Sequence, residues 1–411
     1  MIKPELLAPA GDLERLKVAF AYGADAVYIA GKNLGMRTRT RNFELDELYE
    51  GIKYAHQLGK KVYITANIIA RNYDFVAIEG YFEELGKIKP DALIVSDPGI
   101  FDTAKRILPN MEIHISTQAN VTNYVSVNFW KRLGASRIIL ARELSIAEIC
   151  EINQKSPGIL LEAFVHGAMC MAYSGRCLIS NYMNYRDANR GDCSQPCRWT
   201  YSLVEEKSGK LIPVYEDDDG VHIFNAKDLC MIAHLPALID AGITSFKIEG
   251  RVKTIHYVGT VTKAYRQAID DYMKDPKLYA KRLLHYQSEL KKIIHREYCT
   301  GFYFGPITQA DHCYIEGSIT KAQNFLAIVD DYDPITGLCT VEQRNKFKIG
   351  DKIEVMKTTG ENFTQVVESM HDADGNPLLI APHPQQKIKL KIDAPVAKYD
   401  MIRRVASDAS M

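Results

Sequence analysis

The sequence predicts an α/β protein in which a (β/α)8 TIM-type barrel with a cysteine-bearing insertion is followed by a small C-terminal all-β barrel domain. Three observations predict it. Eight short strand-like runs alternate with amphipathic segments over the first 250 residues or so, one long gap interrupts the alternation, and short alternating strands with turns fill the last part of the chain. Alternation of strands and helices is typical of a parallel sheet covered by helices. A doubly wound open sheet is the alternative, which the lack of a GxGxxG after the first strand disfavours.

The eight strand-like runs are short and rich in β-branched residues, as expected for buried parallel strands. They are Leu6–Pro9, Ala26–Ala30, Lys61–Ala66, Ala92–Ser96, Glu112–Ser116, Arg137–Ala141, Leu161–Val165 and Ser245–Ile248. The segments between the early runs have helical periodicity and end in turn signals. The expected helices are Leu13–Tyr22, Glu44–Leu58, Ala77–Lys87 and a stretch starting at Phe101, with two longer ones after the eighth run, at about Ile255–Met273 and Pro276–Arg296.

The pattern divides the chain into two domains. We assign residues 1–303 to the barrel, with the insertion at about 168–243, and residues 304–411 to the β domain. The segment Tyr298–Pro306 is interpreted as a linker, and short strands begin at about Phe325. Long insertions that follow barrel strands tend to carry function.

The composition is that of a folded, enzyme-sized protein. The chain has 411 residues, a formal net charge of zero, 46% hydrophobic and 25% charged residues. A zero net charge argues against a globally basic nucleic-acid binder, although it allows a local basic patch. The sequence shows no signal-peptide core and no apolar run long enough to span a bilayer. We therefore expect a cytoplasmic protein with reduced thiols and no membrane partner.

Four of the nine cysteines are crowded into one segment with the spacing C-x6-C-x15-C-x3-C: Cys170, Cys177, Cys193 and Cys197. Crowded thiolates usually hold a metal, whereas disulfide frameworks belong to short secreted chains. Zinc ribbons favour paired CxxC motifs, and neither half of this quartet is one, so the spacing favours an iron–sulfur cluster over zinc. Two alternatives to a functional cluster remain open: some of the four cysteines are buried thiols, or the metal only stabilises the fold of the insertion. The quartet follows the seventh strand closely, so it should lie at the catalytic mouth of the barrel.

Polar residues at the predicted strand ends are candidates for a common pocket at that mouth. Period two places Glu162 and His166 on one face of the seventh strand, and Lys247 and Glu249 on one face of the eighth. These four are the catalytic candidates. The alternative is a buried structural pair for Glu162 and His166, and an internal ion pair for Lys247 and Glu249. The candidates for substrate binding are Asn67, Gln118, Arg142 and Arg251 at strand ends, Arg37, Arg39 and Arg41 in the loop after the second strand, and Arg176 and Arg190 in the insertion. The arginines would form a basic rim suited to phosphates or an anionic small molecule, unless they are solvated surface charges.

Several segments of the chain resemble peptidase family U32. They are the opening ELLAPAGDLERLKVAFAYGADAVYIAG, the stretch Glu162-AFVHGAMCMAYSGRCLIS, the stretch Arg186-DANRGDCSQPCRW and the stretch Phe246-KIEGRVK. The similarity runs over nearly the whole chain and is greatest to the branch that hydroxylates tRNA uridine at carbon 5. One departure is Arg37-TRTRNF, where the family has an alanine-rich loop.

The resemblance implies a function and a cofactor. It implies hydroxylation of the wobble uridine of tRNA, with a [4Fe–4S] cluster on Cys170, Cys177, Cys193 and Cys197, prephenate as cosubstrate, the anticodon region as partner, and scope for a paralogous protein partner. The cluster would move electrons, and the barrel mouth would take the extruded base. A metal-dependent, collagenase-like peptidase is one alternative, but the sequence has no HExxH or GxSxG motif. A non-catalytic RNA-binding protein with structural zinc is the other.

Overall fold

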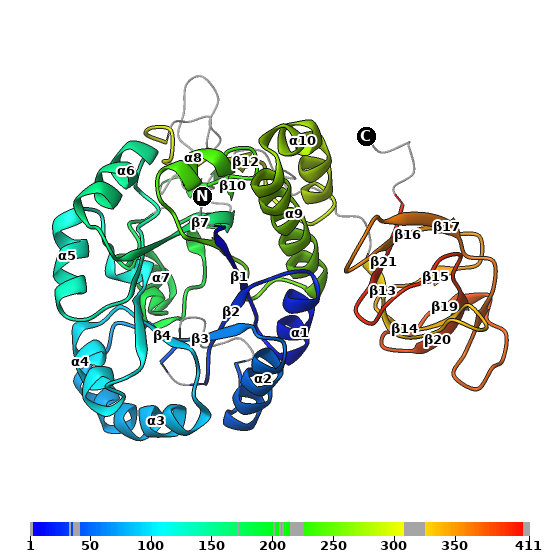
Figure 1. Cartoon of the computed structure of the whole chain (residues 1–411), viewed down its shortest axis with the longest axis horizontal. Helices are drawn as coiled ribbons and strands as arrows, with labels where there is room; N and C mark the ends of the chain where they lie inside the picture. Colours follow the sequence, from blue (N-terminus) through cyan, green and yellow to red (C-terminus); the bar gives the residue numbers. More distant parts are fainter. Residues whose placement is uncertain are drawn as a thin grey trace.

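A parallel barrel forms the larger part of the structure, a computed structural model that describes residues 3–32, 34–35, 42–170, 172–199, 202–204, 207, 209, 211–213, 226–307 and 325–405 (Figure 1). Its eight strands are β1 (Glu5–Pro9), β2 (Ala26–Ile29), β3 (Lys61–Ala66), β4 (Ala92–Val95), β5 (Glu112–Ile115), β6 (Arg137–Ile139), β7 (Leu160–Ala168) and β11 (Ser245–Ile248). Strand β11 pairs in parallel with both β1 and β7, which closes the barrel. The predicted (β/α)8 barrel and all eight of its strands are confirmed.

Helices surround the strands in the order that the sequence predicts (Figure 1). They are α1 (Leu13–Ala21), α2 (Leu45–Gln57), α3 (Phe75–Ile88), α4 (Pro98–Ile107), α5 (Tyr124–Arg132), α6 (Ile146–Lys155), α8 (Leu235–Asp240), α9 (Ile255–Lys274) and α10 (Pro276–Leu290). Helix α4 starts three residues earlier than expected. The Asp97 carboxylate accepts hydrogen bonds from the Gly99 and Ile100 amides, and Pro98 suits the first helical turn. No helix among the described residues is long and apolar enough to cross a membrane.

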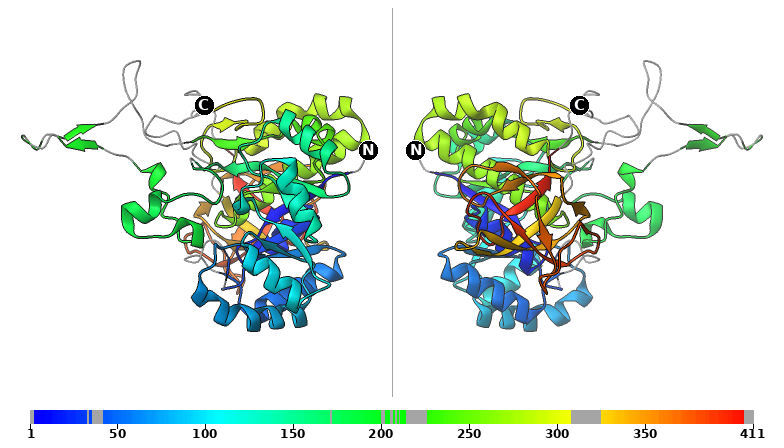
Figure 2. Two further views of the ribbon diagram at one scale, coloured as in Figure 1. Left: turned by 90° about the vertical axis from the view of Figure 1, so that its left-hand side faces the viewer. Right: turned by 90° about the vertical axis from the view of Figure 1, so that its right-hand side faces the viewer.

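The insertion leaves the barrel after β7 and projects from one end of it (Figure 2). It contains the short helix α7 (Ile179–Asn184), the 3-10 turns η3 (Ala188–Arg190) and η4 (Pro196–Arg198), and a hairpin of β8 (Ser202–Val204) and β9 (Leu211–Pro213). The chain returns through β10 (Asp228–Cys230), which pairs antiparallel with β7, and β12 (Tyr298–Cys299) pairs in parallel with β10 at the edge of the sheet. The linker interpretation of Tyr298–Pro306 is therefore wrong at its start. Strands of two or three residues are too short to show a period in the sequence.

The C-terminal domain is an antiparallel β structure, as predicted. Its seven-stranded sheet has the order β17-β16-β21-β13-β14-β20-β18, and β15 pairs with β19 beside it. The strands are β13 (Phe325–Asp333), β14 (Leu338–Gln343), β15 (Phe347–Lys348), β16 (Lys352–Met356), β17 (Phe363–Val366), β18 (Met370–His371), β19 (Ile380–Ala381), β20 (Lys387–Lys391) and β21 (Met401–Arg404). The domain has its own apolar core. The predicted boundary at 303/304 lies just before residues 308–324, which are outside the described residues, and it stays a prediction.

The two domains are joined by apolar and polar contacts. Tyr22, directly after α1, packs with Met356 and Met401 of the β domain, and its hydroxyl donates to the Met356 carbonyl oxygen at 2.8 Å. The buried Arg403 guanidinium is 2.5 Å from a Glu289 carboxylate oxygen on α10 and 2.8 Å from one of Glu354. These contacts fix the β domain against α1, α9 and α10.

Replacing Tyr22 by Phe should loosen this junction. The change removes a buried hydroxyl and leaves the Met356 carbonyl without its donor, a loss of about 1–3 kcal/mol in the free energy of unfolding. The urea midpoint of the purified variant measures it. Tyr49→Phe, at an exposed tyrosine on α2, is the matched control and should leave the midpoint unchanged. Equal midpoints for wild type and Tyr22→Phe would contradict this account of the junction.

Candidate active site at the carboxyl end of the barrel

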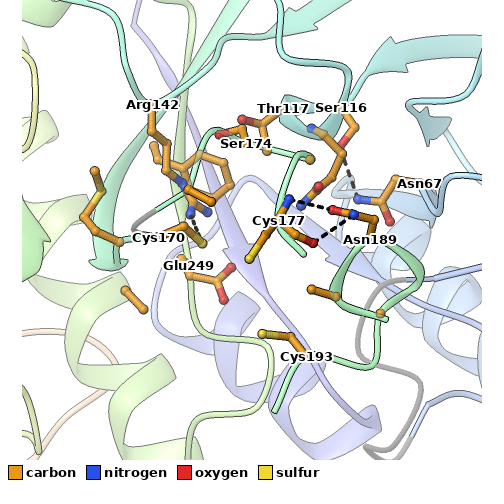
Figure 3. A pocket seen from close by; sticks show the side chains of 18 of the residues that line it. Asn67, Ser116, Thr117, Arg142, Cys170, Ser174, Cys177, Asn189, Cys193 and Glu249 are labelled. Atoms are coloured by element: carbon orange, nitrogen blue, oxygen red, sulfur yellow. Dashed lines mark hydrogen bonds between the residues drawn. The ribbon is translucent and has the colours of Figure 1, made fainter. Parts of the chain in front are cut away.

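A cavity opens where the barrel strands end and the insertion begins (Figure 3). Counted out to its open mouth, it measures about 1300 Å³. Its lining combines residues of the strand ends with residues of the insertion, among them Tyr28, Thr65, Asn67, Ser116, Thr117, Gln118, Arg142, Phe164, Lys247, Glu249 and Arg251 on the barrel side. A cavity at this end of the barrel is the usual place for a TIM-barrel active site.

All four cysteines of the quartet line this cavity. Figure 3 shows Cys170, Cys177 and Cys193 around the space that Glu249 enters. The Asn189 side chain fixes Cys177, because its Oδ1 accepts from the Cys177 amide at 3.2 Å and its Nδ2 donates to the Cys177 carbonyl at 3.0 Å. Among the described residues, no three His, Cys, Asp or Glu side chains are grouped closely enough to hold a single metal ion.

Burial and charge act on the thiols in opposite directions. Burial raises the pKa of Cys177 and of Cys197, and for Cys197 the neighbouring Arg198 opposes that shift. The Arg142 guanidinium, which lies 4.0 Å from the Phe164 ring centre, donates from Nη1 to the Cys170 sulfur at 3.6 Å. Arginines beside the quartet favour the thiolate form of its cysteines, and a bound metal group would favour it further.

Two of the four catalytic candidates line the cavity, Lys247 and Glu249. Lys247 Nζ is 2.9 Å from Glu162 Oε1 and 4.6 Å from the centre of the Tyr28 ring. The Tyr28 hydroxyl donates to Glu249 Oε2 at 3.3 Å. A lysine and a carboxylate, two residues apart at the end of β11, therefore both reach the cavity.

Glu162 lies deeper in the barrel and does not line the cavity. It is fully buried and accepts from Arg137 Nη1 at 3.0 Å and from the Ser245 hydroxyl at 3.1 Å, in addition to Lys247. Burial by itself raises the pKa of Glu162, but the charges of Lys247 and Arg137 outweigh burial and lower it to about 2. The structure therefore places Lys247 in an internal ion pair, but with Glu162 and not with Glu249, the partner that the sequence suggests.

The expectation that His166 shares the barrel interior with Glu162 is wrong. The pairing of β7 with β11 shifts register between Lys247 and Ile248, so that a bulge interrupts the period-two alternation before His166. The His166 ring packs against the rings of Tyr257, Tyr265 and Tyr298. Burial lowers its pKa to about 3, so it is a neutral histidine held outside the cavity.

The candidates for substrate binding divide into three groups. Asn67, Gln118, Arg142 and Arg251 line the cavity. Arg190 and Arg176 do not, since Arg190 forms a two-armed ion pair with Asp74 at 2.6 and 2.8 Å and Arg176 is exposed. Arg37, Arg39 and Arg41 lie outside the described residues.

Sequence reasoning missed several residues of the lining. Tyr28 and Phe164 supply aromatic walls, and Thr65, Ser116 and Thr117 supply hydroxyls. Ser116 and Thr117 follow β5, and Tyr28 and Thr65 lie one residue before the ends of β2 and β3, so their position along the predicted strands was a usable signal. Arg198, one of the arginines interleaved with the cysteines in the sequence, was not missed, and it also lines the cavity.

Comparison with known proteins gives the family. Residues 11–312 match peptidase family U32, and residues 321–403 match the peptidase family U32 C-terminal domain. The tRNA hydroxylation protein P1 of Bacillus subtilis is 43% identical over 98% of this chain and 95% of its own length. The tRNA hydroxylation protein P of Escherichia coli is 38% identical over 93% of this chain and 92% of its own.

A third relative acts on a different RNA. The 23S rRNA 5-hydroxycytidine C2501 synthase of Escherichia coli is 40% identical over 66% of this chain and 40% of its own length. The match to the family covers both the barrel that carries the cavity and the β domain docked on it. The chain therefore belongs to peptidase family U32.

Proposed function

We propose that this protein hydroxylates carbon 5 of a wobble uridine in tRNA, with a [4Fe–4S] cluster on Cys170, Cys177, Cys193 and Cys197. One observation carries the proposal: all four thiols line the same cavity as Lys247 and Glu249, at the end of the barrel where active sites form. Relatives named for tRNA hydroxylation and for 5-hydroxycytidine synthesis support RNA as the substrate and carbon 5 of a pyrimidine as the target.

The donor set fits a cluster better than one zinc ion. A zinc ion about 2.3 Å from each sulfur would draw the four thiolates around one point. Here the thiols surround a cavity, and among the described side chains no three potential ligands are grouped for a single ion. Four cysteines are the usual ligands of a [4Fe–4S] cluster, which supplies electron transfer when bound. Arg142 and Arg198 would offset the negative charge of the thiolates.

The barrel side of the cavity suits an extruded pyrimidine. Tyr28 and Phe164 offer ring faces, and Asn67 and Gln118 offer amides that can pair with the edge of a uracil. Arg142, Lys247 and Arg251 place positive charge in the same cavity, which suits an anionic cosubstrate such as prephenate. Prephenate, tRNA, a paralogous partner and a cytoplasmic location are expectations of this proposal.

We assign Glu249 the role of general base. Its carboxylate would accept the proton that leaves carbon 5 of the uridine during hydroxylation. It is the carboxylate of the cavity lining, and Tyr28 fixes it by a hydrogen bond. Glu249→Gln should lower the hydroxylation rate by about 10²- to 10⁴-fold, the usual contribution of a general base. Binding of tRNA should persist, because the variant keeps the shape of the cavity. A rate within a factor of two of wild type would remove Glu249 from this role.

Arg142 should raise the reduction potential of the cluster, because hydrogen bonds to ligating sulfurs favour the reduced, more negative state. Arg142→Gln removes the guanidinium beside Cys170. We expect the reduction potential of this variant to be lower by tens of millivolts. For a one-electron couple this is on the order of a tenfold change in the equilibrium constant. A spectroscopic redox titration measures it. The matched control is Arg176→Gln in the insertion, whose exposed side chain is outside the lining. Identical potentials for wild type and Arg142→Gln would refute the assignment.

Nucleoside mass spectrometry of tRNA tests the proposed function. A strain that lacks this gene should lose 5-hydroxyuridine-type nucleosides, and a wild-type copy should restore them. Unchanged nucleosides in the deletion strain would contradict the proposal. Cleavage of gelatin or casein by the purified protein, kept in a Cys170→Ala variant, would favour the peptidase alternative.

A further inference from the structure

The insertion carries an unusual number of exposed apolar side chains. Of the 24 large hydrophobic side chains that are exposed in the described part of the chain, six lie between residues 173 and 199: Tyr173, Leu178, Tyr182, Met183, Tyr185 and Trp199. Scattered surface hydrophobics are normal, whereas a concentration in one segment marks an interaction surface. We call its four aromatic members, Tyr173, Tyr182, Tyr185 and Trp199, the aromatic rim.

One member of the aromatic rim lines the cavity, and the other three lie in the same insertion. Tyr173 belongs to the lining and is 63% exposed, so it reaches from the wall to the solvent. Helix α7, which carries Tyr182 and is followed by Tyr185, contacts η3 and η4, and η4 contains Cys197. Figure 2 shows this segment projecting beyond the end of the barrel. The rim therefore belongs to the segment that forms the insertion side of the cavity.

Tyr185 holds an unfavourable backbone conformation. Its φ is 58°, in the left-handed region, at the position after α7 where glycine or asparagine is usual. Its ring is 94% exposed, so packing does not explain the choice of a tyrosine. Strained backbone at a non-glycine residue, combined with an exposed ring, points to a role in binding.

The charge of the segment favours an anionic partner. Residues 172–199 contain four arginines and two aspartates. Arg186 pairs with Asp192 and Arg190 with Asp74, whereas Arg176 is exposed and Arg198 lines the cavity. Aromatic rings beside positive charge are the combination that binds single-stranded nucleic acid, because bases stack on the rings and phosphates lie near the cations.

We propose that the aromatic rim stacks on the bases that flank the target nucleotide, and so holds a single-stranded RNA loop open at the mouth of the cavity. This inference rests on the proposed function and deepens it. It assigns the surface by which the protein would select a single-stranded RNA loop over an RNA duplex. In a duplex the flanking bases stack on each other and present no free face to the rings.

Fluorescence anisotropy with an anticodon stem–loop RNA tests the inference. Tyr182→Ala and Tyr185→Ala should each weaken binding about tenfold, within the range that stacking on one base provides. The slope of log K against log salt should stay as in wild type, because no phosphate contact is lost. Tyr182→Trp should keep the affinity, and Tyr49→Ala, at an exposed tyrosine on α2, is the matched control that should bind as wild type.

Tyr185→Asn separates binding from folding. Asparagine tolerates the left-handed conformation, so this variant should melt at or above the temperature of wild type while losing the same tenfold in affinity. Wild-type affinity in Tyr182→Ala and Tyr185→Ala would overturn the inference and leave the proposed function intact. Failure of the wild-type protein to bind the stem–loop would overturn both. A concentration-dependent dimer of the wild type that Tyr182→Ala abolishes would assign the rim to a second copy of the chain instead.

Discussion

Replacing Cys193 or Cys197 by Ser is expected to abolish hydroxylation and to remove the iron from the purified protein. Both residues line the cavity beside Cys170 and Cys177, and a cluster bound by four cysteines rarely keeps its form when one thiolate is lost. Protein purified without oxygen should contain iron and sulfide and absorb visible light in the wild type. The serine variants should be nearly colourless, and a deletion strain that carries them should lack 5-hydroxyuridine-type nucleosides.

The chain offers a matched control for this experiment. Cys150 on α6 is a partly exposed thiol outside the cavity lining, so Cys150→Ser should keep both the iron and the modification. Far-ultraviolet circular dichroism should show the barrel in all of these variants. Full modification in the Cys193→Ser and Cys197→Ser strains, or a colourless wild type loaded with zinc, would contradict the cluster.

The largest loss of stability is expected from Glu162→Gln. The carboxylate is fully buried and neutralises Lys247 at 2.9 Å and Arg137 at 3.0 Å. Breaking a buried ion pair by removing one partner costs about 3–5 kcal/mol, because the other charge is left uncompensated. The urea midpoint at neutral pH should fall accordingly. The matched control is Glu79→Gln, since the exposed pair of Glu79 with Arg106 contributes at most about 1 kcal/mol.

The pH dependence of stability gives a second measure of the same ion pairs. The folded-state pKa of Glu162 is about 2 and its ordinary value is 4.5. A carboxyl with a depressed pKa stabilises the fold above its unfolded-state pKa, and this contribution is lost as the pH falls from about 4.5 toward 2. Stability of Glu162→Gln should therefore depend less on pH in this window than that of wild type. Parallel pH profiles for the two proteins would refute the assignment.

The barrel was predictable because local and global signals agree there. Each barrel strand is buried, and helices such as α10, with Asp275 and Pro276 at its start, carry their own start signals. Because parallel strands present their carboxyl ends at one rim, the sequence alone could also place Cys170, Lys247 and Glu249 in a common region. That part of the site follows from topology.

The remainder of the site depends on details that no local pattern encodes. The β7 bulge that removes His166 from the interior depends on pairing with β11, 80 residues or so away in the chain. Arg190 pairs with Asp74, which is distant in sequence. The sequence of the insertion alone therefore could not show whether Arg190 binds RNA or forms a structural ion pair. Strands β10 and β12 have three and two residues, too few for a periodic signal.

The position of the added oxygen tests the central claim most directly. Fragments of tRNA from the deletion strain, with and without the wild-type gene restored, can be compared by tandem mass spectrometry at the wobble nucleotide. The account predicts one additional oxygen atom on carbon 5 of that uridine when wild-type protein is present, and none with Glu249→Gln. The same oxygen at the wobble uridine in the deletion strain, or hydroxylation confined to another nucleotide, would contradict it.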